Sequence, residues 1–355
     1  EKGHILGGPF MYIEKGMGKN WRWLAKIFAF FGAGVGLLGI GTFTQVNGIA
    51  TATKDFFDPT AAHTVTLFGH SYSWVVVITA IVVALLTGLV VIGGLKRIAK
   101  VSEVIVPFMA VLYFIACLFV LIVNAEALPG AIAMIFDGAF TGTAAVGGFA
   151  GAVMKEAIQM GVARGIFSNE SGLGSAPIAT AAAKTNWPAR QGLVSMTGTF
   201  IDTIIICTMT GLAVVSTGVW QVGGLEGAAV TAAAFEQSFF FAPAFGKFLL
   251  MVSLAFFAFT TILGWNYYGE RCLEYLVNGR MGPVKVYRYL YILAVLAGPF
   301  LTIEAVWNLA DIFNALMAFP NLIALLALNG VVVAETRVFL NHLRENGELR
   351  GKVRP

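Results

Sequence analysis

The stretch FAFTTILGWNYYGE, residues 257–270, places two hydroxyl groups inside a run of apolar residues. Thr260 and Thr261 are adjacent, and Trp265 follows Thr261 by about one helical turn. Hydroxyl and carbonyl oxygens are hard ligands that suit a small hard cation. A threonine hydroxyl in a helix can instead donate to the backbone carbonyl one turn earlier. Both interpretations stay open from this stretch alone, and the neighbouring tryptophan favours a site.

Two other apolar segments carry groups that could bind a small polar ligand. GTFTQVNG, residues 41–48, holds Gln45 and Asn47, whose amides could bond either a substrate or a neighbouring helix. AAVGGFAGAV, residues 144–153, is rich in glycine. Such a run favours a broken helix with free backbone groups, and close helix packing through small residues is the alternative.

Charged residues at membrane depth are few. Asp202 lies midway along an apolar segment, and Lys155 lies in the lower half of another. An acidic residue inside a membrane is a functional candidate by default. Asp202 could pair with Lys155 across helices, or it could carry a coupled proton. The four histidines are scattered in loops and tails, which excludes a metal site or a catalytic triad built on them.

The composition indicates the solvent in which these groups must work. The 355 residues are 58% hydrophobic and only 12% charged, with a mean hydropathy of +0.80. Soluble domains carry about 25% charged residues. We therefore expect an all-α polytopic membrane protein with one transmembrane domain over residues 1–355. About eight spans are expected, over residues 21–52, 74–94, 103–124, 141–162, 191–217, 246–275, 287–302 and 304–340.

Basic residues predict the orientation of these spans. Most of the 23 Lys and Arg residues, Arg164 among them, fall in loops or tails on alternate sides of the spans. Such loops face the cytoplasm, so both ends of the chain are expected there. The tract 304–340 is long enough for two crossings, with Pro320 as a possible corner. One net crossing agrees with the basic tail, so we expect a surface-lying or half-length helix near 305–317 and a span through 321–334.

One segment is more specific than any of these: RGIFSNESGLGSAPIATAAAKT, residues 164–185. It resembles the signature of the alanine or glycine:cation symporter family, with Ser171 and Thr180 where the family often has Ala and His. The resemblance extends through GTFTQVNG, AAVGGFAG, FAFTTILGWNYYGE and VWNLADIFNALMAFPNLIALLAL, and so covers essentially the whole chain. It implies a LeuT-type inverted-repeat fold. Family members usually have about eleven spans, so about three N-terminal spans are expected to be missing here, including the first core helix.

The resemblance also implies a function: a sodium-coupled symporter that imports a small neutral amino acid, alanine or glycine, by alternating access. A substrate pocket would be formed by seven residues: Phe43, Gln45, Gly147, Gly148, Phe149, Thr261 and Trp265. A sodium site would take oxygens from three: Phe257 (its carbonyl), Thr260 and Thr261. Sodium is then a coupling ion, and no enzymatic cofactor is expected.

The expected setting is the plasma membrane of a prokaryote, with the lipid bilayer as a partner and no nucleic acid. Two alternatives stay open. A proton-coupled carrier would use Asp202. A channel or structural membrane protein would use the same polar groups only to pack helices. An enzyme is not expected, because no nucleophile–base or metal set is visible.

Overall fold

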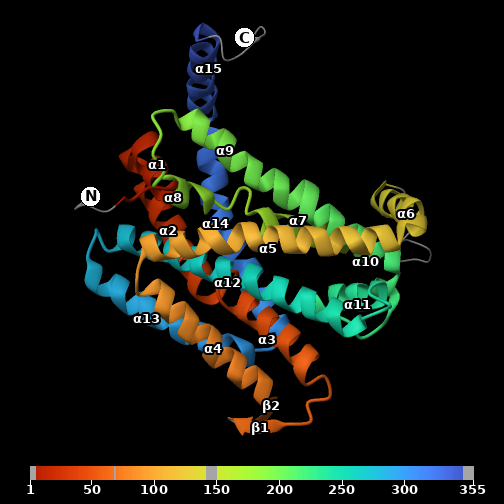
Figure 1. The fold of residues 1–355 in the computed structure, drawn as a ribbon. Helices are drawn as coiled ribbons and strands as arrows, with labels where there is room; N and C mark the ends of the chain where they lie inside the picture. The colour runs from red at the N-terminus through yellow and green to blue at the C-terminus, as the bar shows by residue number, and fades with distance from the viewer. Residues whose placement is uncertain (1–4, 68, 141–149, 347–355) are drawn as a thin grey trace.

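The computed structural model describes residues 5–67, 69–140 and 150–346. The described residues are mostly helical, and the helices are joined by turns and short connections (Figure 1). The first half of the chain forms α1 (Pro9–Gly16), α2 (Arg22–Leu38), α3 (Phe43–Phe57), α4 (Trp74–Val91), α5 (Leu95–Val123), α6 (Leu128–Phe140) and α7 (Ala150–Asn169). The second half forms α8 (Ala176–Thr180), α9 (Pro188–Phe200), a π-helical segment (Ile201–Cys207), α10 (Thr208–Thr217), α11 (Ala228–Ser238), α12 (Pro243–Leu276), α13 (Met281–Ala297), α14 (Ile303–Ala327) and α15 (Asn329–Glu345).

Six helical stretches among the described residues are long and apolar enough to cross a bilayer. They are Lys19–Phe57, Trp74–Val91, Leu95–Val123, Pro188–Thr217, Pro243–Leu276 and Ile303–Ala327. Large apolar side chains remain uncovered on them, such as Leu85 at 63% and Leu89 at 64% exposure on α4. Surfaces of this kind are costly in water and normal in lipid. The expectation of a polytopic helical membrane protein is confirmed.

The long helix α12 lies at the centre of the described fold. It packs against α2, α3, α5 and α13, and Figure 1 shows it running through the middle of the bundle with α2 and α3 across it. Its buried residues include Ile262, Trp265 and Cys272. The Sγ atom of Cys272 approaches Gly32 of α2 so closely that a Cβ atom there would lie 2.6 Å from it. Small residues therefore let these two helices meet.

Two expected spans are divided differently in the structure. The sequence predicts one span over 21–52, but α2 ends at Leu38 and α3 begins at Phe43. In the tract 304–340, α14 is continuous from Ile303 to Ala327 with Pro320 inside it, and α15 follows. The expected short helix near 305–317 with a separate span after it is therefore wrong. Proline lacks only one helical donor, which neighbouring helices tolerate at membrane depth.

A short β-hairpin interrupts the otherwise helical order of elements. Strands β1 (Thr64–Leu67) and β2 (His70–Ser73) pair antiparallel, with Thr64 opposite Ser73. The hairpin fills the connection from α3 to α4. In Figure 1 it lies at the end of the molecule opposite to α1 and α15. Both termini of the described chain therefore lie away from the hairpin.

Candidate functional site

The four residues between α2 and α3 interrupt a helix inside the bundle. The N–H of Gly39 donates to the Val35 carbonyl at 3.0 Å, as in a continuing helix. The N–H of Gly41 then reaches back to the same carbonyl at 3.4 Å, and the Thr42 hydroxyl donates to the Leu37 carbonyl at 2.7 Å. Thr42 is fully buried. An interruption at depth exposes backbone groups that can bind an ion or a zwitterion.

The sequence predicted such a break elsewhere, in 144–153. Residues 141–149 lie outside the described residues, and α7 begins at Ala150. The break between α2 and α3 was missed, because its residues resemble an ordinary apolar span. The sequence GIGTFT, residues 39–44, could have indicated the break, because it places two glycines and two threonines within six residues.

Trp265 of α12 lies directly against this interruption. A Cβ atom on Gly41 would lie 2.4 Å from the Trp265 Cβ atom and 2.8 Å from the Gly36 carbonyl oxygen. The Tyr291 hydroxyl of α13 lies 2.8 Å from the Gly41 carbonyl oxygen and 2.7 Å from that of Ile262. Both carbonyls therefore share one donor. The interruption is held to α12 by close packing and by this shared hydroxyl.

The two adjacent threonines of α12 donate along their own helix. The Thr261 hydroxyl donates to the Phe257 carbonyl at 2.9 Å. The Thr260 hydroxyl lies 3.0 Å from the carbonyls of both Phe256 and Phe257, and 3.7 Å from the Met109 sulfur of α5. The lone pairs of the two hydroxyl oxygens remain available, whereas the Phe257 carbonyl already accepts hydrogen bonds.

The indole nitrogen of Trp265 faces the segment 164–185, which carries the family signature. Its indole N–H donates to Glu170 Oε1 at 2.8 Å, and the Ser175 hydroxyl donates to Glu170 Oε2 at 2.5 Å. Burial raises the pKa of the Glu170 carboxyl, although both hydrogen bonds act in the opposite direction. Glu170 also has a positive φ of 56°. The sequence motif 164–185 is thus anchored to α12 through a residue to which no role was assigned.

A cavity of about 320 Å³ adjoins the first half of α3, the half that follows the interruption. Gln45, a predicted substrate-binding residue, lines it together with Asn47 and Thr51. The lining comprises Thr44, Gln45, Asn47, Gly48, Thr51, Phe167, Glu226, Gly227, Ala228, Thr231, Leu254, Ile303, Val306 and Trp307. Apolar walls with a few amides and hydroxyls are typical of small-molecule sites.

The other expected substrate residues do not line this cavity. Phe43 is buried at the start of α3, and Trp265 is 1% exposed against the helix interruption. Thr261 lies one turn before Trp265 on α12. Gly147, Gly148 and Phe149 lie outside the described residues. The structure therefore brings Phe43 and Trp265 to the interruption and places Gln45 at the cavity beyond it.

Two aromatic residues that the sequence did not single out form one wall of the cavity. The rings of Phe167 and Trp307 lie 4.7 Å apart, and the Arg164 guanidinium lies 4.1 Å from the Trp307 ring centroid. Arg164 donates to Asp311 of α14 at 2.6 Å. Arg164 was assigned to a basic loop, which is wrong: it lies inside α7 and joins α7 to α14. Trp307 and Asp311 both lie in VWNLADIFNALM, one of the segments that carry the family resemblance, so the sequence did mark this region.

Asp202 lies in the π-helical segment, where π geometry often marks a functional position. It accepts a hydrogen bond from the Ser168 hydroxyl at 2.8 Å. Among the described ion pairs none joins Asp202 to Lys155, so the expected structural pair is wrong. In the part of the chain that the structure describes, no cluster of three or more His, Cys, Asp or Glu residues could hold a metal ion.

Comparisons with known proteins identify the family of the chain. A family model described as the sodium:alanine symporter family matches residues 1–352. An uncharacterized transporter of Haemophilus influenzae is 53% identical over 98% of this chain and 71% of its own length. The sodium/alanine symporter AgcS of Methanococcus maripaludis is 44% identical over 98% of this chain and 72% of its own. The amino-acid carrier protein AlsT of Bacillus subtilis is 38% identical over 92% of this chain and 64% of its own.

Proposed function

The chain belongs to the sodium:alanine symporter family, and from this membership we propose that it carries a small neutral amino acid, alanine or glycine, together with sodium. The family consists of cation-coupled amino-acid transporters, so the chain is a multi-pass membrane transporter and not an enzyme. The observation that carries the finer proposal is the interrupted helix between α2 and α3. It lies against Trp265, close to a cavity whose lining includes the amides of Gln45 and Asn47.

The substrate is proposed to bind between the interruption and the cavity. Gln45 would bond the polar ends of the amino acid, while Phe43 and Trp265 would limit its side chain. The remaining proposed contacts are Gly147, Gly148, Phe149 and Thr261. The Phe167–Trp307 pair would form an aromatic wall beside the bound amino acid. A relative named as a sodium/alanine symporter supports alanine as the first substrate to test.

Sodium is proposed to bind the Thr260 and Thr261 hydroxyl oxygens and the Phe257 carbonyl oxygen. In the structure this carbonyl accepts from both threonines. Binding an ion there therefore requires the hydroxyl protons to turn away while their lone pairs face the ion. Three oxygens leave room for further ligands from water, substrate or other segments. An ion in this place would brace α12 against its neighbours, which links sodium binding to the substrate-ready state.

The membrane orientation is part of the same proposal. Both ends of the chain are proposed to face the cytoplasm of a prokaryotic cell, with the β1–β2 hairpin outside. The asymmetry of Lys and Arg between the loops supports this orientation. Uptake would then proceed from the hairpin side, where the cavity includes Glu226 and Gly227 of the α10–α11 connection.

Binding of labelled alanine to the full-length protein tests the proposal. Wild type is compared in sodium and in choline with Thr261→Ala and with Thr336→Ala, a matched control whose hydroxyl donates one turn back on α15 at 2.7 Å. We expect sodium-dependent binding in wild type and in the control. In Thr261→Ala the sodium concentration for half-maximal binding should rise about tenfold, the equivalent of 1.4 kcal/mol.

Full sodium dependence in Thr261→Ala would contradict the sodium assignment. Binding that ignores sodium and disappears in Asp202→Asn would favour a proton-coupled carrier, which the π-helical setting of Asp202 makes the second candidate. Competition by unlabelled glycine and glutamine would measure how narrowly the site selects side-chain size.

A further inference from the structure

A second cavity, of about 400 Å³, lies away from the substrate site. It is found where the α4–α5 turn meets α12 and α13, on the side of the basic loops. Its polar lining comes from Lys96 of α5, Asn266, Glu270 and Arg271 of α12, and Arg288 of α13. Polar residues of three helices thus line a cavity that the transport proposal does not use.

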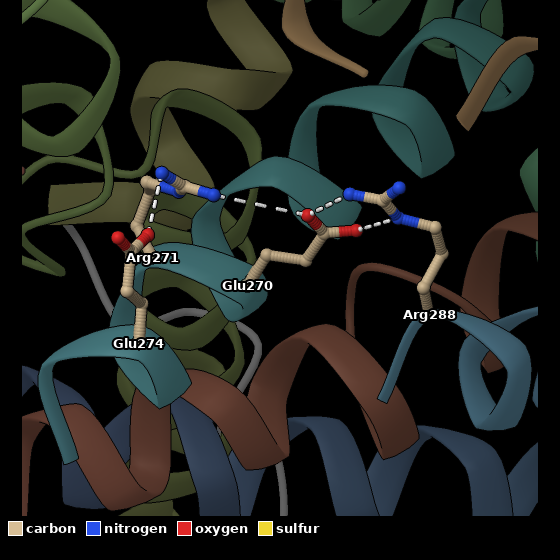
Figure 2. Close-up of polar contacts among 4 residues, drawn as sticks. All are labelled: Glu270, Arg271, Glu274 and Arg288. Atoms are coloured by element: carbon tan, nitrogen blue, oxygen red, sulfur yellow. Dashed lines mark hydrogen bonds and ion pairs between the residues drawn. The ribbon is translucent and has the colours of Figure 1, made fainter. Parts of the chain in front are cut away.

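The charged residues at this cavity form three ion pairs, shown in Figure 2. Glu270 accepts two hydrogen bonds from Arg288, each of 2.7 Å. Arg271 lies 2.5 Å from Glu274 and 3.9 Å from Glu270. Figure 2 shows Glu270 between the two arginines. Both oxygens of Glu270 are therefore engaged by one guanidinium, so this carboxylate has little left to offer a cation.

Several hydrogen-bonding groups at the cavity have no partner among the described residues. Asn266 is 1% exposed, yet neither its Nδ2 nor its Oδ1 atom is bonded. The Nε atom of Arg271 is also buried and unbonded, and Arg271 is 7% exposed. An unpaired buried polar group costs roughly 1–3 kcal/mol. Groups of this kind inside a lined cavity indicate a ligand that completes their bonds.

Positive potential is concentrated at the same place. With Glu270 and Glu274 each paired to an arginine, Lys96 is the charge left over on the lining. Gly94, in the left-handed region at φ 70°, turns the chain into α5, which begins at Leu95. The first N–H groups of a helix lack partners within the helix and favour an anion.

We propose that this cavity binds a phosphate group. Phosphate oxygens would accept from Asn266 Nδ2, Arg271 Nε, Lys96 and the start of α5, while a hydroxyl of the ligand would donate to Asn266 Oδ1. Two sources share this chemistry: free inorganic phosphate and the headgroup of an anionic lipid. Basic pockets between helices on the cytoplasmic side are suited to lipid phosphates. The site is independent of the substrate cavity, and its occupation stabilises the junction of α5, α12 and α13.

Thermal unfolding of the full-length protein tests this site. In detergent, inorganic phosphate is titrated against sodium chloride of equal ionic strength. In nanodiscs, phosphatidylglycerol is compared with phosphatidylcholine. The variants are Lys96→Gln and Asn266→Asp; the latter replaces the amide NH2 group, with its two N–H donors, by a negatively charged carboxylate of the same size. Lys100→Gln is the matched control, since Lys100 lies about one turn further along α5 and does not line the cavity.

We expect phosphate or phosphatidylglycerol to raise the melting temperature of wild type and of Lys100→Gln. In Lys96→Gln the phosphate concentration that gives half of the maximal rise in melting temperature should be about tenfold higher, because one charged contact is lost. Stabilisation by phosphatidylglycerol alone assigns the site to a lipid headgroup, and stabilisation by both assigns it to any phosphate. The proposal is overturned if phosphate raises the melting temperature no more than sodium chloride does and phosphatidylglycerol no more than phosphatidylcholine. It is also overturned if Lys96→Gln responds to phosphate as Lys100→Gln does. Asn266→Asp, where it folds, should lose the response altogether.

Discussion

Two adjacent threonines lie at membrane depth without an unpaired donor, because each hydroxyl proton goes to a carbonyl of α12. This lowers the cost of keeping the hydroxyls in an apolar helix. The oxygen atoms of both hydroxyls keep lone pairs that can bind a cation, about one turn before Trp265 on α12. At this scale the arrangement suits both interpretations of the sequence, and the sodium titration of Thr261→Ala separates them.

Asp58 shows how one side chain organises a connection outside the spans. It follows α3 and accepts from the Ala62 N–H at 2.8 Å and the Ser73 hydroxyl at 2.5 Å. The Ser73 hydrogen bond, followed by those from the backbone, lowers the pKa of the Asp58 carboxyl. The ionised carboxylate therefore ties the start of the hairpin to its end.

Acidification is expected to loosen this hairpin. Because the folded-state pKa is lowered, the contribution of Asp58 is fully present above the ordinary pKa of aspartate. It is lost as the pH falls through the lowered value. Hydrogen exchange over Thr64–Ser73, expressed as protection factors, should show protection falling in acid for wild type. Asp58→Asn should show weaker protection that hardly changes with pH. Equal pH dependence in both proteins would contradict the role given to Asp58.

At the scale of elements, the interruption between α2 and α3 depends on contact with α12. Gly41 has no space for a side chain because the Trp265 Cβ and the Gly36 carbonyl lie against it. The Tyr291 hydroxyl lies within hydrogen-bonding distance of the Gly41 carbonyl in the interruption and of the Ile262 carbonyl in α12. A transporter needs irregular backbone at depth to be enclosed by protein in this way.

Gly41→Ala should therefore damage the protein well beyond the usual effect of a methyl group. Overpacking a tight contact costs typically 1–3 kcal/mol, and we expect less folded protein and little alanine binding. Gly264→Ala is the matched control: Gly264 lies beside Trp265 on α12 with open space around it. That change should be neutral or stabilise the helix by roughly 0.5–1 kcal/mol. Equal melting temperatures for the two variants would show that the contact with Trp265 is unimportant.

The whole molecule combines an apolar exterior with a cluster of charges enclosed between helices. The side chains of Glu270 and Arg271 are 5% and 8% exposed, and that of Arg288 is 20% exposed. Lipid cannot hydrate an ion, so each charge depends on its partner. Breaking a buried pair costs about 3–5 kcal/mol, whereas replacing both partners by apolar residues is often neutral.

Arg288→Met should accordingly lower the melting temperature strongly, because Glu270 is left buried with only the longer, 3.9 Å contact to Arg271. The double variant Glu270→Met/Arg288→Met should recover most of the loss. Arg280→Met serves as the control, since Arg280 is exposed at the start of α13. Thermal unfolding in one detergent compares all three with wild type. A double variant no more stable than Arg288→Met would contradict an energetic role for the pair.

The sequence by itself determined the class of the molecule, its family and the position of most spans. These follow from local properties: long apolar runs, few charges, and the motif at 164–185. Gln45 was also recognised from its place in an apolar run, and the structure puts it on a cavity. Each of these features can be recognised within one segment, because the bilayer imposes the same requirement on every span.

Only the tertiary structure decided where a helix breaks and which side chains meet. The break lies at 39–42 because Gly41 meets Trp265, more than 200 residues further along the chain. Arg164 lies inside α7 and pairs with Asp311 of α14, a contact that no local pattern predicts. The continuity of α14 through Pro320 likewise depends on its neighbours. Contacts between distant segments decide these features, and no pattern within one segment contains them.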